Sequence, residues 1–256
     1  MLRSAFDLPF AVSYPTRPFF SAGSDTIVSI RLRNGISPYE IARTAAVLER
    51  FVQLANAGGL AGRAIEPWRS GVATHSTIAA GPVEVSFRLE RCLFDDASLL
   101  ALCDLFLHKD NVTLVQAIDI GAGAPVQRLI CDRASYSTYP GRFARLPFEL
   151  VDEEPESGAY TFTLTLATEL DDDGRMALAD AMRTWSSFVL AGGFALAPIP
   201  PEENYVEPDD PFVELDHSVE WSVFKLRAHP AAVDALLNTF AAFHGRGRGL
   251  SAVTIS

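Results

Sequence analysis

Two segments of the chain alternate between apolar and polar side chains, at residues 26–32 (TIVSIRL) and 160–166 (YTFTLTL). Such period-two alternation is typical of a β-strand with one buried face and one polar face. The second segment begins 134 positions after the first, and this offset aligns Val28 with Phe162. The alternation therefore predicts two strands that occupy equivalent places in two related units.

The same offset continues through the segments that follow. Each strand precedes a helical pattern that ends at a double glycine, Gly58-Gly59 in the first case and Gly192-Gly193 in the second. A further strand and a further helix align at the same offset, and only at the last strand does the offset change, by one position. The aligned apolar pairs include Leu48 with Met182, Phe51 with Trp185, Val85 with Val219, Phe87 with Trp221, and Phe106 with Phe240. Because unrelated α/β patterns do not keep one offset over about 80 residues, we interpret the chain as a tandem duplication.

The elements of each unit follow the order β-α-β-β-α-β. This order predicts an α+β fold in which a ferredoxin-like unit is duplicated in tandem, with antiparallel sheets that carry helices on one face. Ser37, Pro38 and Glu40 have the spacing of a capping box at the start of the first helix. In the first unit we expect a hairpin from residues 71–79 and 83–91.

The second unit is expected to follow the same order, except that its first hairpin strand is disturbed. Prolines interrupt its first hairpin strand, which we expect to be shortened to Phe212–Leu215 or replaced by a loop. Pro230 is expected at the first position of the last helix, with His229 as its cap. The expected boundaries are a first repeat at 1–125, a connector at 126–158 and a second repeat at 159–256.

The connector is expected to run over the surface, because it is rich in proline and acidic residues. Only Val126–Asp132 within it is expected to add a strand. Alternation also leaves a polar face on each sheet, with residues such as Arg31, Arg88 and Glu220. These faces could line a cavity between two facing sheets or meet water, and the units could also join edge to edge.

Composition and charge narrow the class of protein. Among 256 residues, 48% are hydrophobic and 21% are charged, which is typical of a globular chain. The net charge of −11 disfavours binding to nucleic acid and to anionic membranes, and favours a basic partner. Asp7 and the early prolines do not fit a signal peptide, and no apolar run is long enough to span a membrane. We therefore expect a cytoplasmic protein.

No motif for catalysis, a metal or a cofactor stands out, and we predict none of these sites. The three cysteines lack the spacing of a zinc site, and Gly121-Ala122-Gly123 lacks the third glycine of a dinucleotide loop. His217 is the least ordinary histidine, because the offset aligns it with Val83 on the apolar side of a strand and Asp216 precedes it. On a strand, however, Asp216 and His217 would point to opposite faces, so we expect a turn or sheet-end position for His217, with a functional role as the alternative.

The loops that differ most between the two units are the best candidates for binding. Residues 63–82 are basic and aromatic, whereas residues 196–216 are acidic and aromatic. We expect either that one loop meets a partner or that the two loops pair with each other. The candidate binding residues are Trp68, His75, Tyr205, Asp209, Asp210 and His217.

Two functions remain open on the sequence alone. The leading hypothesis is a non-enzymatic binding protein for a basic protein partner or a small ligand, in the manner of an inhibitor or immunity protein. The alternative is an enzyme or small-molecule-binding protein with a polar site between the two sheets. The ferredoxin-like order does not decide between them, because that fold serves many functions.

Overall fold

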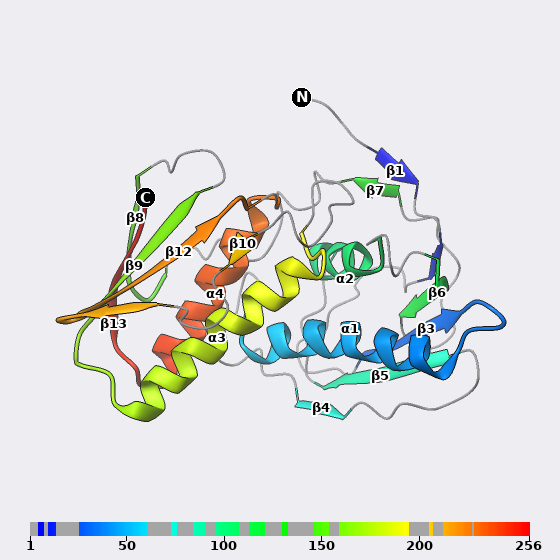
Figure 1. Ribbon diagram of the computed structural model, residues 1–256, viewed down its shortest axis with the longest axis horizontal. Helices are drawn as coiled ribbons and strands as arrows, with labels where there is room; N and C mark the ends of the chain where they lie inside the picture. Colours follow the sequence, from blue (N-terminus) through cyan, green and yellow to red (C-terminus); the bar gives the residue numbers. More distant parts are fainter. Residues whose placement is uncertain are drawn as a thin grey trace.

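The computed structural model has a mixed α+β fold with four helices among the residues that it describes, and its two large sheets lie at opposite sides of the molecule (Figure 1). It describes residues 5–7, 10–13, 26–60, 73–75, 84–90, 96–107, 113–120, 130–132, 146–153, 159–194, 205–206, 212–226 and 228–256. Within these residues, no helix has the length and apolar character needed to cross a membrane.

The first large sheet has five strands. Their order across the sheet is β2 (Ala11–Ser13), β6 (Val115–Ile120), β3 (Thr26–Leu32), β5 (Glu84–Glu90) and β4 (Ala73–His75). β2 runs parallel to β6, and the other neighbours are antiparallel. The helices that belong to this sheet in sequence are α1 (Pro38–Asn56) and α2 (Asp96–Leu107). We call these elements the first unit.

The second large sheet repeats this arrangement of strands. Its order is β8 (Glu149–Asp152), β13 (Leu250–Ile255), β9 (Tyr160–Leu166) and β12 (Ser218–Phe224), with β10 (Tyr205–Val206) and β11 (Val213–Leu215) both paired to β12. β8 runs parallel to β13, as β2 does to β6. With α3 (Asp172–Leu190) and α4 (Ala231–Gly245), these strands form the second unit. A separate pair joins β1 (Ala5–Asp7) to β7 (Ile130–Asp132).

The alternating segments are strands β3 and β9, as predicted, and the apolar residues matched by the offset are buried: Val28, Ile30 and Leu32 in β3, and Phe162, Leu164 and Leu166 in β9. The predicted capping box is confirmed, since the Ser37 hydroxyl accepts from the backbone N–H of Glu40 while the Glu40 carboxylate accepts from that of Ser37. Both double glycines end their helices, because Gly58 and Gly192 adopt φ values of 92° and 100° that other residues disfavour.

Two predicted strands are confirmed where the structure describes them. Ala73–His75, within the strand expected at 71–79, form β4, and Ile130–Asp132, within the strand expected at 126–132, form β7. The other positions of these two expected strands lie outside the described residues. The expected surface connector supplies β8, an edge strand of the second sheet. Pro230 lies at the N-cap of α4, not at the first helical position as predicted. His229 therefore lies one residue before the cap, and its ring nitrogen Nδ1 accepts a hydrogen bond from the backbone N–H of Ala231 at 3.1 Å.

The helices of the two units pack against each other between the two large sheets (Figure 1). α1 contacts α3, where the rings of Phe51 and Phe188 lie 6.3 Å apart. The side-chain amide of Asn238 on α4 donates to the carbonyl of Gly59 after α1, at 3.3 Å. The buried residues therefore form one apolar core that runs through both units.

The polar faces of the sheets consequently point away from each other. Arg31 pairs with Asp119 at 2.8 Å on the outer face of the first sheet. Thr161 and Ser222 contact each other at 3.3 Å on the outer face of the second. Among the described strands, the polar faces do not enclose a cavity between the sheets, because helices fill that space. The units are not joined edge to edge either.

Close packing at Gly193 gives a first prediction. A Cβ atom at this position would collide with the ring of Phe188, which is fully buried and packs against Phe51 and Phe194. Since the ring has no free space to enter, we expect Gly193→Ala to lower the free energy of unfolding by about 1–3 kcal/mol, as measured by urea denaturation.

A matched substitution is available at Gly35, which lies in an exposed turn with open space around it and a φ of 82°. Asparagine tolerates this backbone conformation, so Gly35→Asn should stay within about 1 kcal/mol of the parent. Equal stability losses in the two variants would contradict the close packing at Gly193.

Candidate functional site

An open hollow of about 1020 Å³ lies at one end of β9 and β12 in the second sheet. Its walls come from Thr163 and Thr165 on β9, from Glu169 before α3, from Arg175 in the first turn of α3, and from the hairpin segment 214–218. Because β9 and β12 are antiparallel, Thr165 pairs with Ser218. The strand-to-helix loop and the hairpin turn therefore meet at the same end of the sheet.

The hairpin between β11 and β12 turns tightly at Asp216 and His217. Leu215 pairs with Ser218, which leaves these two residues to reverse the chain. His217 has a φ of 38°, and its carbonyl accepts from the N–H of Leu166 at 2.8 Å. The turn position predicted for His217 is confirmed, and its side chain is exposed rather than placed on the apolar side of a strand as the offset to Val83 indicated.

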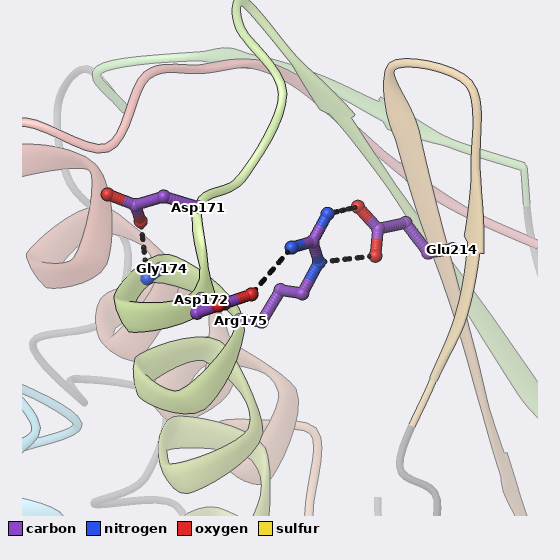
Figure 2. Close-up of polar contacts among 5 residues, drawn as sticks. All are labelled: Asp171, Asp172, Gly174, Arg175 and Glu214. Atoms are coloured by element: carbon purple, nitrogen blue, oxygen red, sulfur yellow. Dashed lines mark hydrogen bonds and ion pairs between the residues drawn. The ribbon is translucent and has the colours of Figure 1, made fainter.

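Arg175 fastens the hairpin to the start of α3 (Figure 2). Its guanidinium donates from Nε and Nη2 to the two oxygens of Glu214 at 2.7 and 3.0 Å, and from Nη1 to Asp172 at 3.1 Å. Hydrogen bonds from Arg175 lower the pKa of Glu214, and the same bonds raise the pKa of Arg175. Both groups are therefore charged at neutral pH, and the forked pair holds the wall of the hollow in place.

The start of α3 is fixed independently of this pair. The Asp171 carboxylate caps the helix by accepting from the N–H of Gly174 at 2.7 Å (Figure 2). Acidic residues suit this position because the first turn of a helix carries a partial positive charge. Arg175 thus projects from a rigid helix end and makes its contacts with Glu214 and Asp172.

Carboxylates dominate the charge that remains in the hollow. Glu169 and Asp216 line it, and neither makes an ion pair with another described residue. Beside them, β11 presents Val213 and Leu215 with 62% and 48% of their surfaces exposed. The hollow therefore combines unpaired negative charge with apolar side chains at an edge of the sheet.

The predicted binding residues are distributed over both units. Trp68, Asp209 and Asp210 lie outside the described residues. His75 ends β4 in the first sheet, where it pairs with Arg88. Tyr205 begins β10 and pairs with Phe224, at the opposite end of β12 from His217. Of the described candidates, His217 alone lines the hollow.

Sequence reasoning missed Arg175 and Glu169. Arg175 follows three consecutive aspartates, and this arrangement is also typical of an ordinary exposed helix start. A usable signal was the topology, since the end of β9 and the start of β12 must adjoin in an antiparallel pair. Charged residues just beyond both points were therefore expected neighbours.

Within the part of the chain that the structure describes, no group of three or more histidine, cysteine, aspartate or glutamate side chains is placed to hold a metal ion. The geometry of the hollow is the main guide to function, because the sequence matches no known family model and no curated protein.

Proposed function

We propose that this chain is a non-enzymatic binding protein that recognises a basic protein partner through the hollow of the second unit. The observation that carries the proposal is the pair of carboxylates, Glu169 and Asp216, that line the hollow without an ion pair among the described residues. A lysine or arginine from a partner would supply the missing counter-charge, and the exposed Val213 and Leu215 would supply apolar contact area.

The net charge of −11 supports the same class of partner. A strongly acidic protein attracts a basic one over distances comparable with the Debye length, which speeds their encounter at low salt. An inhibitor or immunity protein for a basic target would use charge in this way. The forked Arg175–Glu214 pair supports such a role by keeping the hairpin in one position before binding.

We also propose that the scaffold arose by tandem duplication of a ferredoxin-like unit. The order β6-β3-β5-β4 in one sheet has the counterpart β13-β9-β12-β11 in the other, and each has one additional parallel edge strand. The constant sequence offset between matching elements supports the same origin. On this view the hollow is an addition of the second unit to a common framework.

The alternative, a polar site between the two sheets, receives no comparable support. Arg31 and Glu220 lie on the outer faces of different sheets, and the helices of both units lie between those sheets (Figure 1). The recognition proposal therefore has the better structural case.

Removing the two unpaired charges tests the proposal. We expect the double variant Glu169→Gln and Asp216→Asn to bind a basic partner roughly 5- to 10-fold more weakly, because each exposed ion pair contributes up to about 1 kcal/mol. The partner is first captured from the source cell on the immobilised protein at low salt, then purified and titrated by calorimetry against both forms.

A double variant with equal charge provides the control. Glu49→Gln on α1 and Glu84→Gln on β5 also remove two exposed carboxylates, but outside the hollow. This control should bind the partner almost as tightly as the parent protein. Equal weakening in both double variants would show that only net charge matters, and recovery of no basic protein at low salt would contradict the proposed function.

A further inference from the structure

The edge of the second sheet farthest from the hollow is formed by β8, and it is unusually open. All four residues of β8 are exposed, including Leu150 at 38% and Val151 at 37%. The corresponding strand of the first sheet is β2, where Val12 is 2% exposed and Ser13 is 8% exposed. The same position in the two sheets is therefore mostly buried in the first unit, where only Ala11 is exposed, and fully exposed in the second.

The backbone of β8 is also available for pairing. The N–H of Glu153 donates to the carbonyl of Ile255, so the backbone groups of Val151 and Glu149 point toward β13 as well. Because successive residues of a strand alternate in direction, the N–H and C=O groups of Leu150 and Asp152 point away from β13. No strand in the described part of the chain pairs with that side.

The side chains along this edge indicate what could pair there. Glu149, Asp152 and Glu153 are exposed around Leu150 and Val151. A second copy of the chain would bring these carboxylates against their own equivalents, which is unfavourable. A strand with lysine or arginine would meet opposite charge instead. Each face of β8 offers one apolar residue and at least one acid, so a matching strand carries both types on both faces.

We propose that β8 is a second binding surface, which accepts an extended basic segment of a partner protein as an added strand. The main-chain groups of Leu150 and Asp152 bind the segment, the two apolar side chains contact it, and the acids select its charge. Natural edge strands usually carry features that block such pairing. Here acids block self-pairing and leave heterologous pairing open. The surface is separate from the hollow, because β8 and β11 lie at opposite edges of the sheet.

A short synthetic peptide serves as the probe. We choose the blocked, fluorescently labelled sequence Lys-Lys-Val-Val-Lys-Lys, which places lysine and valine on both faces of an extended strand. Its binding to the full-length chain is measured by fluorescence anisotropy, and the exchange of the Leu150 and Asp152 amides by NMR. We expect those two amides to exchange at least several-fold more slowly when the peptide is bound, because they become hydrogen-bonded.

Changes to the peptide isolate the main-chain contribution. Methyl groups on the nitrogens of alternate residues remove hydrogen-bond donors from one edge while keeping every charge. We expect the peptide methylated along its pairing edge to bind about tenfold more weakly, as strand addition requires. Unchanged binding by peptides methylated along either edge would overturn the proposal, since charge alone would then account for the affinity.

Changes to the protein locate the site. Leu150→Pro removes an outward-facing N–H that β13 does not use, so the sheet should persist and the peptide should bind about tenfold more weakly. If this variant loses its native circular dichroism, Glu149→Gln with Asp152→Asn replaces it and should weaken binding several-fold. Glu220→Gln, at the centre of the outer face, is the single-charge control and should leave binding nearly unchanged.

Two outcomes would assign the surfaces differently. Peptide binding that survives Leu150→Pro but is lost with Glu169→Gln and Asp216→Asn would place the peptide in the hollow and overturn the role of β8. Concentration-dependent dimerisation that Leu150→Pro abolishes, measured by analytical ultracentrifugation, would assign the edge to a second copy and also overturn it. The first outcome would also support binding of basic segments in the hollow, whereas the second would leave the proposal for the hollow unaffected.

Discussion

Trp185→Ala is expected to lower the free energy of unfolding by about 3–5 kcal/mol, because it opens a large cavity in the core. Trp185 is fully buried on α3, and its ring meets that of Trp221 edge to face at 5.6 Å. Its indole Nε1 donates to the carbonyl of Ala232 at 2.7 Å. Guanidinium denaturation monitored by circular dichroism measures the loss.

Two further substitutions separate the contributions. Trp185→Phe keeps an aromatic ring but leaves the Ala232 carbonyl without this donor, so we expect a smaller loss of about 1–3 kcal/mol. Met176→Ala removes a large apolar side chain from the same helix at a position 59% exposed, and should stay within about 0.5 kcal/mol of the parent. A Trp185→Ala variant as stable as Met176→Ala would contradict the packing described for α3.

The counterpart of Trp185 in the first unit is Phe51, which is equally buried and contacts Phe188 across the helix layers. Since one core runs through both units, Phe51→Ala and Trp185→Ala should each shift a single unfolding transition. Two separate transitions, with each variant moving only one, would show that the units unfold independently.

The alternating strands and the helix ends were predictable because their causes are local. Period two at residues 26–32 and 160–166 follows from one buried face, and Gly58 and Gly192 adopt the positive φ that ends a helix. β8 was missed because four residues among prolines and acids carry little periodic signal. Only the parallel pairing with β13, about 100 residues away in sequence, makes them a strand.

The helix-to-helix arrangement was harder to predict, although a signal existed. α1 buries adjacent pairs such as Val47 with Leu48 and Phe51 with Val52. Taken together, the buried residues of α1 cover a wider arc of the helix than one narrow contact stripe, which indicates packing against more than one neighbouring element. Of the residues that line the hollow, the sequence indicated His217 but not Arg175. The role of Arg175 depends on its hydrogen bonds to Glu214, and the distance between these two side chains cannot be predicted from their spacing in the sequence.

Asn238→Asp is expected to destabilise the protein by about 3–5 kcal/mol at neutral pH, because it creates a buried charge without a partner. Asn238 is fully buried on α4, and its amide nitrogen donates to the carbonyl of Gly59, a contact that joins α4 to the segment after α1. A carboxylate there would face this carbonyl, with acceptor against acceptor. The first unit has Asp104 at the matching position.

The destabilisation should depend on pH in a defined direction. Burial raises the pKa of the new carboxyl group in the folded state above its value in the unfolded chain. The folded state then binds more protons, so the variant regains stability as the pH falls through the folded pKa and toward the unfolded one. Comparing the variant with the parent by urea denaturation at each pH cancels the titration of Glu214 and other shared groups.

Asn238→Ala is the control for this titration. It also removes the bond to Gly59 but adds no ionisable group, so its loss of about 1–3 kcal/mol relative to the parent should be the same at acidic and neutral pH. A difference between Asn238→Asp and Asn238→Ala that grows with pH would show that the contact between the helix layers excludes water. A constant difference would contradict that burial, because a hydrated carboxylate there would keep an ordinary pKa.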